Sequence, residues 1–316
     1  MRRIVTLFLP GLIATGLFTH SVTAQSGRLN PVIRALETGQ PIFSLPHPAL
    51  TRGGGRGRGP AGTPESSAPA ATPIDLAAAA KETVAYTRAH YLTTSGTSEA
   101  FLTYLDEVRK AGDSMRTHPF GAKVGIWHQN PETVKTAIER QLNAGLVNVS
   151  MEAVESPQEV RDVIKAMRLT SAGGTRPETG LEKAAEYWGL SVDAYKKKAD
   201  VWPLNKNGEL LVTVIIESLP GLEKAREIAA EPGVAQVGVG YGTLGGVFKG
   251  DQEAREKAAR TVLAACKAAK VRCAFPVTNT AELEQRMKEG WSSFIMQRRD
   301  ENALAAIEAG RKDRTP

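Results

Sequence analysis

The sequence has few of the patterns that mark several large classes of protein. It contains 2 cysteines and 5 histidines among 316 residues, and the cysteines have no metal-ligand spacing with any histidine. After the first 24 residues, no apolar run approaches the length of a membrane span. The glycine-rich stretches do not match the dinucleotide-binding fingerprint. These absences argue against a cysteine–histidine metal site, a membrane-spanning domain and a dinucleotide-binding fold.

The chain also lacks a strong excess of either charge. The formal net charge is +6, from 40 basic and 34 acidic residues. Three of the arginines, Arg52, Arg56 and Arg58, lie in one glycine-rich segment without the interleaved aromatic residues of a nucleic-acid-binding surface. We therefore expect no nucleic-acid partner.

The N-terminus has the pattern of a cleaved export signal at residues 1–24. Arg2 and Arg3 precede the apolar run Ile4–Phe18, and a small-x-small pattern that ends at Ala24 fits cleavage before Gln25. The run is short for a membrane span and contains a proline, which favours a cleaved signal over an uncleaved anchor. Cleavage removes both arginines and lowers the net charge from +6 to +4. We expect an exported protein, periplasmic or secreted, without membrane association after cleavage.

The two cysteines have two open interpretations. Cys266 and Cys273 are expected near the end of a helix and in the strand that follows it. Export would permit a disulfide between them. Adjacent elements of this kind, however, often hold their Cα atoms too far apart for one. The sequence therefore leaves a disulfide and two buried thiols equally open.

Residues 25–316 are expected to form one domain with a disordered insertion. Residues 52–73 are almost entirely Gly, Pro, Ala, Ser, Thr and Arg, which bury too little apolar surface to become ordered. We interpret this segment as an inert insertion rather than a lid or a partner-binding arm.

The rest of the chain alternates predicted strands and helices. The strands are expected at 41–45, 83–88, 122–127, 146–151, 210–216, 234–239, 271–275 and 292–296. The helices are expected at 30–39, 74–81, 98–112, 131–144, 157–167, 251–270, 280–289 and 301–311, with another of about a dozen residues after 220. A polar excursion at 170–208 carries two helical pieces, 180–188 and 191–199. Strands that are each followed by a helix, eight in all, predict an α/β fold, a closed (β/α)8 TIM barrel rather than an open doubly wound sheet.

The chain is organised around one βαβ unit. The apolar run Leu210–Ile216 is typical of a strand buried on both faces, and it stops at Glu217. The next strand runs into the glycine-rich segment Gly240–Gly246, which we expect to be a loop whose backbone N–H groups suit a carboxylate or phosphate. Because α/β barrels bind ligands beyond the carboxyl ends of their strands, Glu217 and this segment are expected to face one cavity.

Two carboxylates at predicted strand ends suggest a metal site. Glu152 and Glu217 end consecutive strands, so they can converge on Mg²⁺ or Mn²⁺ with water completing the coordination. The alternative is that Glu152 is a solvated loop residue and that Glu217 caps the helix that begins near Pro220. Spacing alone favours neither interpretation.

Histidines and a tryptophan add further candidates. His90 ends a predicted strand and is a candidate general base, because an imidazole titrates near neutral pH. Trp127 ends another predicted strand and His128 follows it directly, and both are candidates for substrate binding. His47 lies beside a predicted loop and His118 lies in a predicted turn, and we interpret both as structural.

Several stretches resemble the HpcH/HpaI aldolase/citrate lyase family. They are NPVIRALETGQP at 30–41, NAG at 143–145, VESPQEV at 154–160, VIIES at 214–218 and GYGTL at 240–244, and the excursion is similar to that of a subgroup with a GxGTLxGVF segment. The resemblance implies a (β/α)8 barrel that cleaves 2-oxo acids with a divalent metal. It also implies a homo-oligomer, a trimer or a hexamer.

The resemblance assigns roles to individual residues. Glu217 falls on the family's metal-binding Glu, and His90 falls on its catalytic His. The backbone amides of Gly242 and Thr243 fall where the family holds the pyruvate carboxylate. Thr243 also stands where the family has a metal-binding Asp, so Glu152 is expected to replace that ligand.

Three functions follow as expectations. The first is an exported carbon–carbon lyase in which a metal on Glu217 polarises the 2-oxo group of a small 2-oxo acid and His90 moves the proton. The second is a barrel that has lost catalysis and binds a small oxo acid or another anion on the glycine segment. The third is a different lyase or hydrolase in which His128 or Glu152 has taken over.

Overall fold

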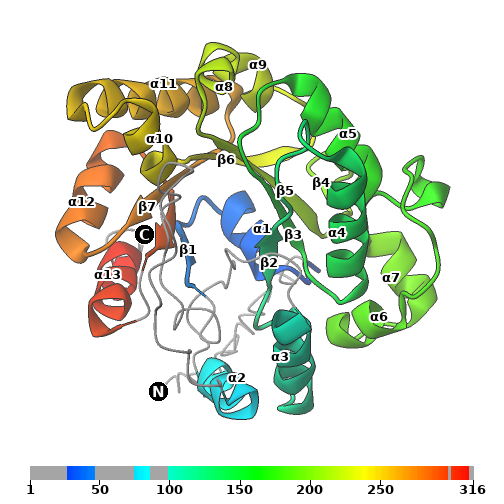
Figure 1. Ribbon diagram of the computed structural model, residues 1–316. Coiled ribbons are helices and arrows are strands. Elements are labelled where there is room, and N and C mark those ends of the chain that lie inside the picture. The colour runs from blue at the N-terminus through cyan, green and yellow to red at the C-terminus, as the bar shows by residue number, and fades with distance from the viewer. Residues whose placement is uncertain (1–26, 47–74, 86–98, 298–299, 313–316) are drawn as a thin grey trace, which may run out of the picture.

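The fold is a curved parallel sheet with helices around its convex side (Figure 1). The computed structural model describes residues 27–46, 75–85, 99–297 and 300–312. The predicted signal at 1–24, the predicted insertion at 52–73 and the candidate base His90 lie outside these residues.

The strands pair in parallel along a path of seven, in the order β1-β8-β7-β6-β5-β3-β2, and β4 pairs with β5 beside this path. Their bounds are β1 Ile42–Ser44, β2 Gly121–Lys123, β3 Asn148–Met151, β4 Val201–Trp202, β5 Leu210–Ile216, β6 Val234–Val239, β7 Arg272–Val277 and β8 Ser293–Met296. The predicted α/β class is confirmed. Among the described residues, β1 and β2 are not joined, so the sheet is an open part of a barrel rather than a closed one.

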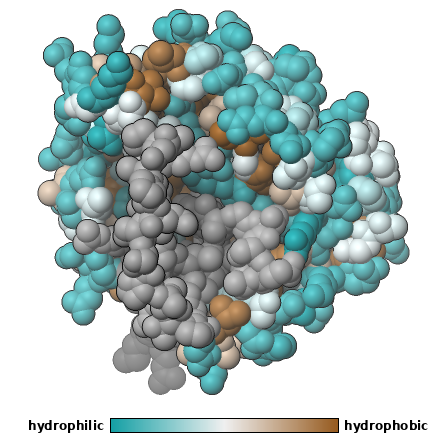
Figure 2. Space-filling model, in the orientation of Figure 1, coloured by the Kyte–Doolittle hydropathy of each residue, from teal (hydrophilic) through white to brown (hydrophobic). Residues whose placement is uncertain are grey.

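The helices cover the convex side of this sheet, with α1 as the exception (Figure 1). They are α1 Pro31–Glu37, α2 Leu76–Ala85, α3 Glu99–Lys110, α4 Pro131–Asn143, α5 Pro157–Met167, α6 Glu182–Trp188, α7 Val192–Lys198, α8 Leu219–Glu223, α9 Ala225–Ala229, α10 Tyr241–Val247, α11 Gln252–Ala269, α12 Thr280–Glu289 and α13 Glu301–Lys312. On the face in Figure 2, this ring of helices presents mostly hydrophilic residues to solvent. None of the helices that the structure describes is long and apolar enough to cross a membrane.

Many helix starts are set by local capping, which is why they were predictable. The cap residues Asn130, Ser156, Asp251 and Asn279 each accept a hydrogen bond from the backbone N–H three residues further on. A proline follows the cap at the start of α4 and α5, where its missing N–H costs nothing. The predicted starts of α4, α5 and α12 are confirmed.

Three of the local predictions described next were wrong, and one short strand was missed. The predicted strand at 83–88 begins inside α2, because the alanine-rich run from Leu76 has a helix propensity that outweighs the short β-branched pair after it. The predicted helix after Pro220 is two short helices, α8 and α9, which meet at Lys224. The glycine-rich segment expected as a loop is the helix α10. Strand β4 was not predicted, because two residues carry no periodic signal.

The two faces of the sheet have different neighbours. Val149, Val212 and Val237 belong to the main hydrophobic core beneath the outer helices. Leu211 belongs to a second cluster, together with Ile42, Ala235 and apolar residues of α1. Because side chains alternate along a strand, this division identifies the inner face, on which α1 packs against the amino ends of the strands.

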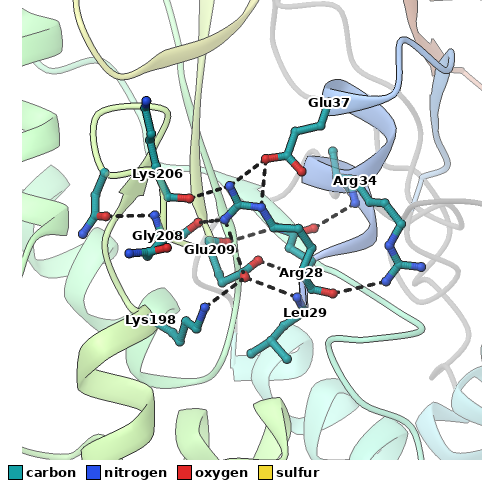
Figure 3. A network of polar contacts seen from close by, with 12 residues as sticks. Arg28, Leu29, Arg34, Glu37, Lys198, Lys206, Gly208 and Glu209 are labelled. Atoms are coloured by element: carbon teal, nitrogen blue, oxygen red, sulfur yellow. Dashed lines mark hydrogen bonds and ion pairs between the residues drawn. The ribbon is translucent and has the colours of Figure 1, made fainter. Parts of the chain in front are cut away.

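A polar network fixes α1 in this position (Figure 3). Glu209, immediately before β5, is fully buried and accepts hydrogen bonds from the backbone N–H groups of Leu29 and Asn30. Arg28 donates to Glu37 at 2.6 Å and to the carbonyl of Gly208 at 3.0 Å. Burial raises the pKa of Glu209. The hydrogen bonds from Asn30 and Leu29 and the positive charges of Arg28 and Lys198 only partly offset that effect. The network closes the amino end of the inner face.

Cys266 in α11 and Cys273 in β7 form a disulfide, with their Cα atoms 5.8 Å apart. Lys270 ends α11 in the left-handed conformation, and this turn brings the strand back beside the last turn of the helix. Both cysteines are buried. The structure therefore decides between the two interpretations that the sequence left open.

The excursion between α5 and β5 is attached to the barrel by a buried acid. Asp200 accepts bonds from Arg168 Nε at 2.7 Å, Arg168 Nη2 at 3.1 Å, Asn205 Nδ2 at 2.9 Å and the Val201 N–H at 2.8 Å. Burial by itself raises the pKa of Asp200, but these hydrogen bonds together outweigh it and lower the pKa below its usual value of 3.8.

This pKa direction predicts a pH dependence. An acid with a lowered folded pKa stabilises the fold above its unfolded pKa, and the stabilisation is lost as pH falls through the folded pKa. We expect Asp200→Asn to lose about 2 kcal/mol of unfolding free energy at pH 7, because charge-assisted hydrogen bonds become neutral ones. As pH falls below 3.8 and through the lowered folded pKa, the wild-type protein loses the same contribution, so the difference between the two proteins should shrink. Urea unfolding at pH 7 and at a series of acidic pH values measures this, and a constant difference between the proteins would contradict it.

Candidate active site

The inner face of the sheet carries a belt of polar side chains. Ser150 on β3 is the register partner of Lys123 on β2 and of Thr213 on β5. Asn148 joins two of them, because its Nδ2 donates to Ser150 Oγ at 3.0 Å and its Oδ1 accepts from Thr213 Oγ1 at 2.9 Å. On the same face, Glu152 lies two residues beyond Ser150, and Glu217 lies four residues beyond Thr213, at the carboxyl ends of their strands. We call Lys123, Glu152, Glu217 and Gly240 at this edge the mouth.

Glu217 has little exposed surface at the mouth. The residue is 9% exposed and packs so closely on Gly240 that a Cβ at position 240 would collide with its carboxylate. No hydrogen bond to this carboxylate comes from the part of the chain that the structure describes. The predicted alternative, that Glu217 caps the following helix, is wrong, because Ser218 Oγ accepts the bond from the Gly221 N–H at 3.2 Å. Its carboxylate therefore remains available for a ligand.

Glu152 follows β3, the hydrogen-bonded neighbour of β5. Its Oε1 accepts a hydrogen bond from Lys123 Nζ at 3.0 Å. Both side chains are partly exposed, at 29% for Lys123 and 28% for Glu152. Glu152 is therefore a partly solvated residue in the bend after β3, and a cation on the adjacent strand balances its charge.

Trp127 and His128 do not end a strand, because β2 stops at Lys123 and both residues lie in the turn before α4. Trp127 is 8% exposed and belongs to the main hydrophobic core, which leaves it little surface for a substrate. The ring of His128 lies 3.3 Å from Glu159 Oε2 through Nδ1. Its Nε2 lies 4.0 Å from Glu155 Oε2, so two acids orient this imidazole at the rim.

The glycine segment meets the mouth as the start of α10. The first bond of the helix runs from the Leu244 N–H to the Gly240 carbonyl, so the N–H groups of Gly242 and Thr243 precede the helical ladder. Both residues are exposed, and nothing lies within 4 Å of where a Cβ on Gly242 would be. The two amides are therefore accessible to an anion.

A group of residues from α11 and α12 holds α10 in place. The Tyr241 hydroxyl donates to Glu256, and Glu256 also accepts from Arg286 at 2.7 and 2.9 Å. Arg255 stacks 3.5 Å from the centre of the Tyr241 ring and donates to the Tyr241 carbonyl. Burial and Glu256 raise the pKa of Tyr241, and the bond from Arg286 lowers that of Glu256. These contacts fix the first residue of the helix.

Sequence reasoning missed Lys123 and this supporting group. The signal for Lys123 was present, because Ala122 and Val124 on either side are apolar and face the main core, which turns Lys123 inward. No spacing in the sequence indicates that Arg286 pairs with Glu256, since they lie 30 residues apart. His118, interpreted as structural, is fully buried with its Nδ1 2.8 Å from Asp113.

The donors for a metal at the mouth are few. Glu217 fits, because its carboxylate has no competing partner among the described residues. Glu152 fits only through Oε2, since Oε1 is engaged by Lys123. Within the described ranges, no group of three or more His, Cys, Asp or Glu side chains could hold a metal ion.

Several solved structures have the same fold as this chain. A HpcH/HpaI aldolase/citrate lyase family protein from Burkholderia cenocepacia J2315 is 21% identical over 90% of this chain and 100% of its own, with a TM-score of 0.62. The HpcH/HpaI aldolase from Desulfitobacterium hafniense DCB-2 is 13% identical over 90% and 97%, also with a TM-score of 0.62.

A citrate lyase beta subunit from M. tuberculosis, complexed with oxaloacetate and magnesium, is 12% identical over 89% and 100%, with a TM-score of 0.50. No curated protein has significant sequence similarity to this chain. The family profile of HpcH/HpaI aldolase/citrate lyase matches residues 108–297, which include the mouth, α10 and the supporting helices. The chain therefore belongs to the HpcH/HpaI aldolase/citrate lyase family.

Proposed function

We propose that this protein is a carbon–carbon lyase that acts on a small 2-oxo acid at the mouth and depends on Mg²⁺ or Mn²⁺. The observation that carries the proposal is Glu217. Its carboxylate ends β5 on the inner face and receives no hydrogen bond from the described residues. It is therefore open to a cation, and carboxylate oxygens are the ligands that Mg²⁺ and Mn²⁺ prefer. The related citrate lyase beta subunit was solved with magnesium, and lyase-type enzymes recur among the proteins that share this fold.

Glu217 would be the main protein ligand of the metal, with Oε2 of Glu152 as a second donor. Thr243, which stands where the resemblance expects a metal-binding Asp, offers only a neutral hydroxyl. Bound there, the ion would act as a Lewis acid on the 2-oxo carbonyl, which is the electron sink that carbon–carbon cleavage needs.

The other groups bind the substrate and move its proton. The accessible N–H groups of Gly242 and Thr243 would bind the substrate carboxylate, as backbone amides at a helix start bind anions. His90, outside the described residues, is the proposed base. His128, oriented by Glu159, is proposed as a rim contact, and Trp127 supports this turn from the core.

We also propose a closed barrel, export of the protein and assembly into a homo-oligomer. The sheet would close into a (β/α)8 barrel around the mouth, in a single domain at 25–316. The signal pattern at 1–24 supports export to the periplasm or beyond, and the family resemblance supports a homo-oligomer. The mild net charge supports the absence of a nucleic-acid partner.

The second candidate is a catalytically impaired barrel that binds a small oxo acid or another anion. Two observations favour it. A threonine stands where the resemblance expects a metal-binding Asp, and the nearest replacement, Glu152, is already paired with Lys123. The accessible amides of α10 would be retained in such a protein.

Two measurements on the purified protein separate the candidates. Calorimetry with Mn²⁺, with and without pyruvate, should show metal binding that is strengthened by pyruvate. NMR in D₂O should show exchange of the pyruvate methyl protons, because the proposed chemistry removes a proton next to the 2-oxo group. Pyruvate binding without metal binding or exchange would select the anion-binding barrel.

A further inference from the structure

An apolar strip lines the inner face of the sheet beside the mouth. Strands β5, β6, β7 and β8 are neighbours in the sheet (Figure 1). In their carboxyl halves, every second residue belongs to the main core on the outer side. Because side chains alternate along a strand, the residues between these core positions face inward. They are Ile215, Gly238, Ala274, Pro276 and Ile295, and we call them the strip.

The strip is continuous across the four strands. Ile215 on β5 is the register partner of Gly238 on β6, and Gly238 is the partner of Ala274 on β7. Pro276, two residues further along β7, is the partner of Ile295 on β8. The five residues therefore form one surface rather than separate apolar positions.

The strip begins at the mouth and ends at polar residues. Glu217 lies two residues beyond Ile215 on the same face, and Gly240 lies two residues beyond Gly238. In the opposite direction along β5, the polar residue Thr213 precedes Ile215 by two residues. Two residues of a strand rise by about 7 Å, so the strip matches a short apolar group.

The apolar side chains of the strip lie outside both hydrophobic cores. Nearer the amino ends of the strands, Leu211 packs with α1 in the second cluster. Among the described residues, neither cluster includes Ile215, Ala274 or Ile295. Pro276 and Ile295 are only partly buried. An apolar surface beside a polar site, without a core to cover it, is typical of a ligand-binding groove.

Gly238 in the middle of the strip is not required by a close contact. Among the described residues, a Cβ there would lie 3.6 Å from the Cβ of Ala274, which is an ordinary van der Waals distance. At Gly240, by contrast, a Cβ would collide with Glu217. An atom of a ligand therefore fits over Gly238 without displacing the strands.

We propose that the strip is the specificity-determining wall of the site and binds a short apolar substituent on C3 of the 2-oxo acid; this inference rests on the proposed 2-oxo acid chemistry. With the head of the substrate at Glu217 and α10, its C3 substituent extends over the strip on the same strands. The strip's side chains carry no hydrogen-bonding group or charge, so a hydroxyl or carboxylate there would lose water without gaining a partner. The substrate class is therefore an aliphatic 2-oxo acid rather than a dicarboxylic or polyhydroxylated one.

Calorimetry of the full mature protein with Mn²⁺ tests this preference, with pyruvate, 4-methyl-2-oxopentanoate and 2-oxoglutarate as ligands. The second acid is pyruvate with an isopropyl group on C3. We expect it to bind at least about 10-fold more tightly than pyruvate, because each buried methylene contributes about 4-fold. 2-Oxoglutarate has a carboxymethyl group on C3 and should bind no more tightly than pyruvate.

Two variants locate the preference on the strip. Ile295→Asn places a polar group on a partly exposed position, and Ile215→Ala removes apolar contact without adding a polar atom. Each should lower the ratio of the affinity for 4-methyl-2-oxopentanoate to that for pyruvate by about 5-fold. A thermal melt of each variant establishes that it is folded.

Leu204→Asn is the matched control, because Leu204 is an apolar residue that is 43% exposed in the turn after β4, outside the strip. It should leave both affinities unchanged. Equal wild-type affinities for pyruvate and 4-methyl-2-oxopentanoate would overturn this inference and leave the proposed function intact. The same holds if 2-oxoglutarate binds most tightly, or if neither strip variant changes the ratio. Failure of all three acids to bind would overturn the proposed function as well.

Discussion

Glu217→Gln should abolish Mn²⁺ binding at the mouth and with it the exchange of pyruvate protons. We expect Mn²⁺ affinity to fall by more than about 100-fold, since even the outer partners of metal ligands contribute 10 to 100-fold. The amide is nearly the same size as the carboxylate, so the contact with Gly240 is kept. Calorimetry and the exchange assay measure the effect.

The same variant should be at least as stable as the wild-type protein without metal. The carboxylate receives no hydrogen bond from the described residues, so its replacement by an amide of nearly the same size breaks none. A thermal melt of the metal-free proteins tests this point. A clear loss of stability would indicate that Glu217 is a structural residue.

Glu209→Gln is the matched control, because Glu209 and Glu217 flank the two ends of β5. Glu209 is also buried, but it binds backbone amides at the amino end of the strand. The Glu209→Gln substitution should leave Mn²⁺ affinity unchanged. Equal losses of Mn²⁺ affinity in the two variants would contradict a metal site at the mouth.

Arg176→Ala is the substitution that should destabilise the excursion most. Arg176 is 1% exposed and donates to the Met167 carbonyl at 3.0 Å and to Asn143 Oδ1 at 3.1 Å. Its guanidinium also lies 5.9 Å from the centre of the Tyr195 ring. Alanine would leave buried acceptors unpaired and a large cavity, so we expect a loss of about 3 to 5 kcal/mol in unfolding free energy.

Urea unfolding measures this loss, and Arg161→Ala provides the contrast. Arg161 pairs with Glu231 at 2.6 Å but is 51% exposed, so its removal should cost less than about 1 kcal/mol. Similar losses in the two variants would show that burial of Arg176 does not hold the excursion. The metal affinity of both variants should match that of the wild type.

In the βαβ unit, the position of the main site residue was predictable but its surroundings were not. Strand β5 and the position of Glu217 at its end were predicted from a run of apolar residues, and this part is confirmed. The state of the Glu217 carboxylate was not predictable. Its lack of a hydrogen bond depends on Ser218 capping the next helix and on the packing against Gly240, which comes from another strand.

The glycine-rich segment of the same βαβ unit was predicted as a loop but is a helix. Gly240–Gly246 has a composition typical of a loop, because glycine lowers intrinsic helix stability. Tertiary contacts override this preference, since Arg255, Glu256 and Arg286 hold the start of α10 from two other helices. The intrinsic helix propensity of a single residue contributes little to stability, and tertiary contacts of this kind contribute more.

The sequence by itself determined most of the strand and helix alternation, the capped starts of α4, α5 and α12 and the residues that end β5 and β6. These features depend on neighbours within about four residues, so a local pattern contains them. Only the tertiary structure decided that Lys123 pairs with Glu152, that Cys266 and Cys273 are joined and that α1 fills the inner face. Such contacts join separate elements, and their geometry depends on how the whole sheet curves.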